Sequence, residues 1–122
     1  MIRGIRGAIT VAENTENALR EATKEILTRI IEANNISLEN VAYLAFSATE
    51  DLDCAFPARF AREISGFELI PMECYQEMRV KPSLALCLRL MMAVNTEKPA
   101  KEIKHVYLKG AASLRQIGRA HV

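Results

Sequence analysis

The sequence of 122 residues contains little of what most specialised protein classes require. It has no tryptophan, three tyrosines and four phenylalanines, so few aromatic side chains are available to stack against bases. Lysine and arginine total 16 and aspartate and glutamate total 15, which is not the basic excess expected of a nucleic-acid-binding surface. We therefore expect no nucleic acid as a partner.

Cysteine and histidine are also scarce. The three cysteines are an odd number without a C-x-x-C pair, which is unlike a disulfide framework or a zinc ribbon. The two histidines, His105 and His121, are too few for a histidine-rich metal site. Reduced thiols in a cytosolic protein without a metal site are the simplest interpretation.

Long apolar runs are absent as well. The apolar stretch at residues 84–94 is interrupted by Arg89 and is shorter than the roughly 20 residues needed to cross a bilayer. The first residues carry Arg3 and Arg6 without the apolar segment of a secretion signal. We expect a cytoplasmic protein with no membrane-spanning segment.

The residues that are present can form a compact core, since half of them are hydrophobic. Apolar residues at helical spacing predict a long helix over residues 15–34. Pro57 suits the first turn of a second helix that runs to about residue 65, and Gly66 suits the left-handed residue that ends it. One helical turn is expected at residues 111–114.

Apolar and β-branched segments predict about five strands. The segment at residues 41–48 is apolar throughout, which is typical of a strand covered on both faces. Pro71 interrupts the third strand and indicates an edge or a bulge. The predicted strands span residues 2–11, 41–48, 67–74, 86–94 and 103–108.

These elements predict an α+β domain with a mixed β-sheet and both main helices on one face. Two helices cannot cover all of the apolar strands, so a partner subunit is expected to cover the rest. The domain is expected to span residues 1–115. Residues 116–122 show no periodicity, and we expect them to be a mobile or non-native tail.

Motifs for phosphate binding, dinucleotide binding and zinc proteolysis are absent, and no Ser/His/Asp set can be recognised. Arg89, however, lies between two leucines, and a guanidinium is costly to bury unless it is paired. Arg89 and Arg6 can each face solvent or a carboxylate, or can bind an anion in a cleft. Glu77 can be a solvated loop charge, Cys74 a small buried residue and Tyr107 a half-buried strand aromatic.

The second predicted helix carries further candidates with two interpretations. Phe56 precedes Pro57 and can belong to the core. Arg59 and Arg62 are three residues apart, so they share a helix face that is ordinarily solvated. The residue types alone leave these alternatives open.

A series of blocks, in the same order along residues 1–115, resembles the AroH-type chorismate mutases. No block is specific alone, but together they cover almost the whole chain. The matching blocks are Met1–Ala8, Ser47–Asp53, Phe56–Arg59 with Arg62–Glu63 and Ser65–Gly66, Cys74, Gln76–Met78, Arg89–Met92 and His105–Leu108.

This resemblance implies a homotrimer with a pseudo-α/β barrel core and active sites in clefts between subunits. The implied reaction is the cofactor-free Claisen rearrangement of chorismate to prephenate, the first committed step towards phenylalanine and tyrosine. Because no proton moves in this reaction, it needs no poised histidine and no metal.

The resemblance also implies roles for single residues. Arg89 would lie against the ether oxygen and a carboxylate of the substrate. Arg6 and Tyr107 would bind the enolpyruvyl carboxylate. Glu77 would accept a hydrogen bond from the substrate hydroxyl, with Cys74 beside it.

The adjoining subunit would supply the rest of the pocket. Phe56 and Ala58 would line its wall, and Arg59 and Arg62 would supply positive charge at its mouth. Arg59 stands where the family can have lysine, which keeps the charge.

Three further residues have smaller implied roles. Leu114 would help to close the pocket, and Met72 and Glu73 would contribute edge or backbone contacts. Glu73 stands where the family can have an uncharged residue. The tail after residue 115 does not match the family, so the resemblance leaves its role as a lid open.

Two other functional classes fit a trimeric fold of this kind. One is a hydrolytic imine deaminase with an interface arginine that binds a carboxylate, and the other is a non-catalytic trimer that binds an anionic metabolite. Glu77 facing Arg89 across one pocket favours the mutase, because a binding module needs the cations but not the carboxylate.

Overall fold

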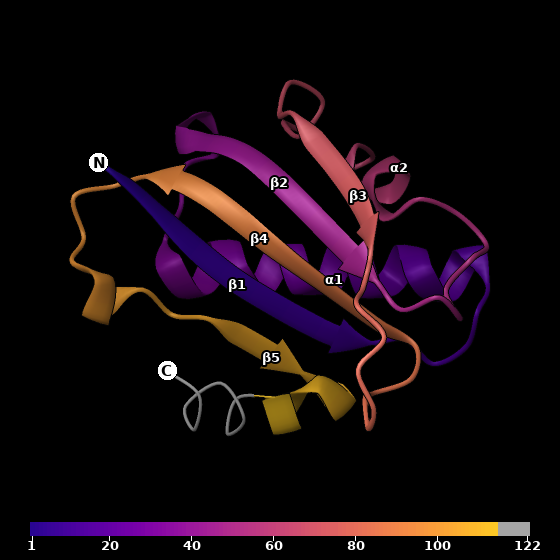
Figure 1. The fold of residues 1–122 in the computed structure, drawn as a ribbon. Coiled ribbons are helices and arrows are strands. Elements are labelled where there is room, and N and C mark those ends of the chain that lie inside the picture. The colour runs from indigo at the N-terminus through magenta and orange to yellow at the C-terminus, as the bar shows by residue number, and fades with distance from the viewer. Residues whose placement is uncertain (115–122) are drawn as a thin grey trace.

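The computed structural model describes residues 1–114, and the predicted tail at residues 116–122 lies outside the described part. Five strands, two α-helices and three short 3₁₀ helices follow one another in these residues (Figure 1). In chain order they are β1 (Ile2–Thr10), α1 (Glu16–Asn34), η1 (Leu38–Asn40), β2 (Val41–Ala48), α2 (Pro57–Ala61), β3 (Met72–Gln76), β4 (Cys87–Asn95), η2 (Ala100–Glu102), β5 (Val106–Leu108) and η3 (Lys109–Ser113).

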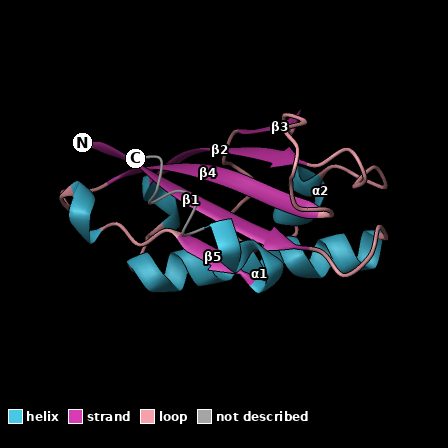
Figure 2. Cartoon of the chain, turned by 60° about the horizontal axis from the view of Figure 1, so that its bottom comes forward, coloured by secondary structure: helices cyan, strands magenta, loops and turns pink. Residues whose placement is uncertain are grey.

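The strands form one mixed sheet in the order β3-β2-β4-β1-β5. Strand β4 is antiparallel to both β1 and β2, whereas β3 runs parallel to β2 and β5 parallel to β1. Helices α1 and α2 lie on the same face of this sheet (Figures 1 and 2). The predicted α+β class, with both helices on one face of a five-stranded sheet, is confirmed.

Helix α1 agrees with its prediction because its local signals are strong. The Thr15 side chain caps the first turn by accepting a hydrogen bond from the Ala18 N–H at 3.2 Å. Asn35 ends the helix in the left-handed conformation, with φ of 50°. The apolar stripe of the helix, including Leu19, Ile26 and Ile30, is fully buried against the sheet.

Helix α2 is shorter than predicted and ends at Ala61 instead of residue 65. The following N–H groups of Glu63 and Ile64 bond to carbonyls three residues back, which tightens the chain into turns. Gly66, with φ of 94°, does adopt the predicted left-handed conformation. The third strand begins only after Pro71, and the buried Phe67 lies in a turn. As predicted, this strand is at an edge.

Strand β4 starts one residue later than predicted, and β5 starts three residues later. Leu86 has a positive φ of 48°, which a strand residue does not adopt, and β4 begins directly after it. Residues 100–102 form a 3₁₀ turn, so β5 starts at Val106 and His105 precedes the strand instead of lying in it. The helical turn predicted at residues 111–114 is a 3₁₀ helix, η3, that starts two residues earlier.

The sheet face opposite α1 and α2 is called the open face here. Large apolar side chains are exposed on it, namely Ile2 (54%), Tyr43 (49%), Tyr75 (57%) and Met91 (39%). Figure 2 shows that the two α-helices leave this side of the sheet uncovered. Within residues 1–114, no helix has the length and apolar character needed to cross a membrane.

Candidate active site

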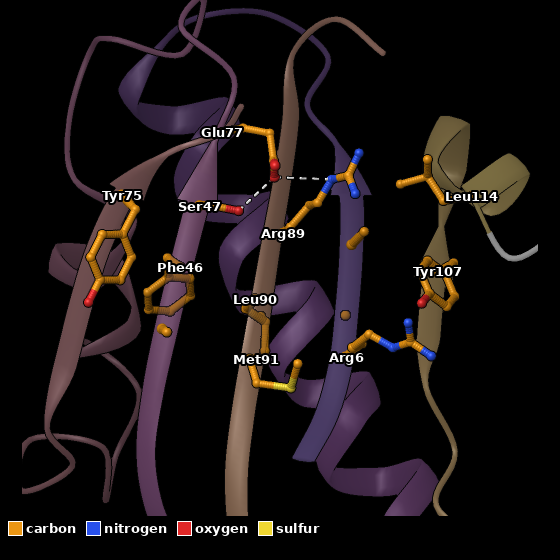
Figure 3. A pocket seen from close by; sticks show the side chains of 13 residues that line it. Arg6, Phe46, Ser47, Tyr75, Glu77, Arg89, Leu90, Met91, Tyr107 and Leu114 are labelled. Carbon is orange, nitrogen blue, oxygen red and sulfur yellow. Dashed lines mark hydrogen bonds and ion pairs between the residues drawn. The ribbon is translucent and has the colours of Figure 1, made fainter. Parts of the chain in front are cut away.

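A cavity of about 410 Å³ lies on the open face, and residues from all five strands and from the segments that follow β3 and η3 line it (Figure 3). Five of the predicted site residues line it, and they come from positions far apart in the sequence. These residues are Arg6, Glu77, Arg89, Tyr107 and Leu114.

Strand register brings the polar side chains of the cavity together. Arg89 lies between Ala8 of β1 and Ser47 of β2, its partners on either side in the sheet. Ala8 is in turn opposite Tyr107 of β5. Because alternate residues of a strand share a face, Arg6 lies on the same face as Ala8.

Glu77 forms an ion pair with the Arg89 side chain in this cavity. The Arg89 Nε lies 3.3 Å from Glu77 Oε2, and the Ser47 hydroxyl donates a hydrogen bond of 2.8 Å to the same oxygen. The Nε atom is buried and makes no hydrogen bond within residues 1–114, so its contact with Glu77 is an ion pair without hydrogen-bond geometry. Figure 3 shows the guanidinium extending from β4 towards Leu114.

Arg6 and Tyr107 occupy the other end of the cavity (Figure 3). Of the described residues that line it, two are arginines and Glu77 is the one carboxylate. The cavity therefore has an excess of positive charge, together with a fixed pair of opposite charges at Arg89 and Glu77. Such a cavity suits a small anion with more than one negative group.

Two predicted residues line a different cavity. Cys74 and Phe56 border a second hollow of about 420 Å³ where β2 and β3 end, and Phe56 is 73% exposed. Tyr75 borders both cavities. Glu73 is exposed and accepts a hydrogen bond from the Tyr75 hydroxyl.

The remaining predicted residues lie away from the first cavity. Met72 is half-buried and packs against the core, and Ala58 is a core residue of α2 that is only 4% exposed. Arg59 forms an ion pair of 2.8 Å with Glu16, and Arg62 is exposed at the end of α2. A single chain does not bring these residues to Arg89.

The comparison with protein families agrees with this geometry, since residues 2–117 match the sequence model of chorismate mutase type I. The chain belongs to the chorismate mutase type I family. The family resemblance of the sequence blocks is thus confirmed.

Individual relatives carry the same name. The chain is 47% identical over 115 residues to chorismate mutase AroH of Bacillus subtilis, covering 94% of this chain and 91% of that protein. It is 46% identical over 116 residues to chorismate mutase AroH of Thermus thermophilus, covering 94% of each. A solved chorismate mutase from Clostridium thermocellum is 41% identical, with a TM-score of 0.87 over 91% of this chain and 98% of that one.

Sequence reasoning missed two polar residues that line the first cavity, Ser47 and Tyr75. Ser47 lines the cavity and bonds to Glu77, although the two are 30 positions apart in the chain. Its place follows from the pairing of β2 with β4, which sets Ser47 directly beside Arg89. The alternation of β2 indicates which residues share its face, but the sequence does not show which strand lies next to it.

The thiol nearest to Arg89 is Cys87, which the sequence analysis did not single out. Burial raises the pKa of the Cys87 thiol, and the positive charge of Arg89 opposes that shift only in part. The thiol is therefore neutral at physiological pH and is a poor nucleophile. In residues 1–114, no group of three or more histidine, cysteine or acidic side chains is arranged to hold a metal ion.

Proposed function

We propose that this chorismate mutase rearranges chorismate to prephenate without a cofactor, by electrostatic stabilisation in a cleft that a neighbouring copy completes. The observation that carries the proposal is the cavity on the open face, where Arg89 and Glu77 stand 3.3 Å apart with opposite charges. Arg6 and Tyr107 lie at its other end.

The charge pair suits the electronic course of the rearrangement. Breaking of the C–O bond runs ahead of formation of the C–C bond, so negative charge gathers on the ether oxygen and the enolpyruvyl part while the ring becomes positive. Arg89 would stabilise the ether oxygen, and Glu77 would lie on the side of the ring and its hydroxyl. Charges fixed before the reaction need no reorganisation during it.

Substrate binding accounts for the other cations. Chorismate is a dianion, and arginine binds carboxylates through two parallel hydrogen bonds. Arg6 and Tyr107 would hold the enolpyruvyl carboxylate and so keep the substrate in the compact conformer that reacts. Leu114 would border the bound substrate at the edge of the cavity.

We further propose a homotrimer with a pseudo-α/β barrel core. Support comes from the exposed apolar residues of the open face and from Phe56, Arg59 and Arg62, which one chain leaves outside the first cavity. In the trimer these residues would face the cavity of the adjoining copy. The three free cysteines fit a reducing compartment, so we propose a cytoplasmic location.

Replacing Arg89 tests the mechanism. Arg89→Met keeps most of the length of the side chain but removes the charge, and we expect kcat for chorismate to fall by at least about 100- to 1000-fold. Arg89→Lys keeps the charge without the planar fork and should show an intermediate defect. Loss of chorismate absorbance gives kcat and KM, with an imine substrate as the control for a deaminase.

Arg29, which is exposed on α1, provides the matched control, and Arg29→Met should leave both constants unchanged. Circular dichroism checks the folding of each variant. A folded Arg89→Met protein within about tenfold of the unmodified enzyme would remove Arg89 from the mechanism. Turnover of the imine instead of chorismate would favour the deaminase.

A further inference from the structure

A histidine side chain takes the place of a strand carbonyl beside the cavity. The ladder between β1 and β5 begins at the pair Gly7–Val106. One position earlier, where the β5 segment has not yet become a strand, the Arg6 N–H donates a hydrogen bond of 3.0 Å to Nδ1 of His105. An acceptor at Nδ1 requires that the proton of the neutral ring be on Nε2.

The surroundings of the ring favour its neutral form. Burial lowers the pKa of His105 from 6.5, and the nearby positive charge of Arg6 lowers it further. The segment before His105 is joined to α1 by an uncharged side chain, because the Asn34 amide bonds to both the carbonyl and the N–H of Lys104. Arg6 on β1 is the charged group of the described residues that acts on the pKa of the ring, and Lys104 and Tyr107 lie before and after His105 in its own segment.

We propose that His105 is a positioning residue for chorismate binding: its Nδ1 fixes the Arg6 backbone, and this directs the Arg6 side chain into the cavity beside Tyr107. The inference rests on the proposed role of Arg6 in holding a substrate carboxylate. Figure 3 shows why the backbone matters, since Arg6 reaches the cavity from the strand next to β5. Without the acceptor, the Arg6 N–H lies at the start of the ladder with no strand carbonyl opposite.

Protonation removes the contact. A proton on Nδ1 turns the acceptor into a donor that faces the Arg6 N–H, so the hydrogen bond is lost and two donors oppose each other. Because the folded state lowers the pKa, the ring stays neutral above about pH 6.5 and protonates only below that value. Binding of chorismate should therefore weaken on acidification below pH 6.5, with a rise in KM.

Two substitutions separate the hydrogen bond from the bulk of the ring. Asparagine places Oδ1 close to the position of Nδ1, so His105→Asn keeps an acceptor and does not titrate. His105→Leu keeps the volume but has no acceptor. We expect His105→Leu to raise KM roughly tenfold with a smaller change in kcat. His105→Asn should recover most of that loss and abolish the rise in KM below pH 6.5.

Equal KM values for His105→Leu and the unmodified enzyme would overturn the proposal, as would a His105→Asn variant as impaired as His105→Leu. Persistence of the acidic rise in KM in His105→Asn would also overturn it. Thermal unfolding of each variant shows whether a change in KM merely follows a loss of fold.

A measurement without substrate separates this inference from the proposed function. In ¹⁵N-labelled protein, the His105 ring should show an unprotonated Nδ1 at pH 7.5. The Arg6 amide resonance should shift together with the ring as pH falls. The positioning role is contradicted, whatever the activity, if Nδ1 of His105 is protonated at pH 7.5. It is also contradicted if the Arg6 amide resonance does not shift as the His105 ring titrates. If the spectra are as expected but the protein does not turn over chorismate, the proposed function is contradicted and the hydrogen bond of His105 is not.

Discussion

Among the single residues of the cavity, Glu77 has a side chain whose position is restrained by its neighbours. Glu77 meets two partners through the same oxygen, the Ser47 hydroxyl at 2.8 Å and the Arg89 Nε at 3.3 Å. The Glu77 side chain is largely shielded from solvent, so these partners replace much of its hydration. The carboxylate is thus held in place before any substrate arrives, and electrostatic catalysis requires this restraint.

Removing the Ser47 hydroxyl should loosen this carboxylate. A hydrogen bond to a charged group contributes more than one between neutral groups, so we expect Ser47→Ala to lower kcat/KM for chorismate by about tenfold. The effect should fall mainly on kcat if Glu77 acts in the transition state. Steady-state kinetics with chorismate measure both constants.

Ser37→Ala is the matched control, because Ser37 is exposed and its side chain does not cap the 3₁₀ helix that follows it. This variant should keep the kinetics of the unmodified enzyme. If Ser47→Ala also kept them, the orientation of Glu77 would not depend on Ser47.

Among the elements, local signals predicted α1 better than the starts of β3 and β5. Thr15 and Asn35 mark the two ends of α1 by their own chemistry, as a cap and as a residue that accepts the left-handed conformation. Leu86, directly before β4, has the left-handed conformation, which leucine rarely adopts, so no pattern in the sequence indicates that the strand starts after it.

The same limit applies to the candidate site. The family blocks led to Arg6, Glu77, Arg89, Tyr107 and Leu114, which one cavity brings together. The role of Ser47 depends on strand order, and strand pairing over long sequence distances is not encoded in any local pattern. The roles proposed for α2 depend on a second copy of the chain.

The end of α1 is joined to the segment before β5 by one buried side chain. Asn34 donates to the Ile30 and Lys104 carbonyls and accepts from the Lys104 N–H, with distances between 2.8 and 3.0 Å. Asn34→Ala would leave the N–H and carbonyl of Lys104 without these partners in a partly buried place. We expect the free energy of unfolding to fall by about 2–3 kcal/mol.

Urea denaturation at one fixed protein concentration measures this loss, because association would make the apparent stability depend on concentration. Asn40→Ala is the comparison, since Asn40 is exposed and its replacement should change the free energy of unfolding by less than about 0.5 kcal/mol. Similar effects of the two substitutions would show that Asn34 does not stabilise this junction.

At the scale of the whole molecule, the two sides of the sheet differ. On one side, α1 and α2 bury a continuous core that includes Phe46, Phe60 and Phe67. The open face instead exposes Tyr43 next to Ala93, which is itself opposite Gly4. Large apolar side chains exposed together on one face are typical of a contact surface, so this face suits a second copy of the chain.

A charge on the open face should therefore prevent assembly. Tyr43→Glu would place a carboxylate in an apolar contact without a partner, and such a charge costs several kcal/mol to bury. We expect sedimentation velocity to show a trimer for the unmodified protein and a monomer for Tyr43→Glu at micromolar concentration. Chorismate turnover should be lost with the trimer, because each cavity would lack the residues of its neighbour.

The comparison variant also replaces an exposed apolar residue by glutamate, but away from the open face. Leu69 is 91% exposed in the segment between α2 and β3, so Leu69→Glu adds a carboxylate outside the sheet and should leave both the trimer and its activity intact. A trimeric Tyr43→Glu protein would show that the open face is not the contact surface. A monomer with full activity would show that the cavity of one chain is sufficient, and that the residues of α2 have no part in catalysis.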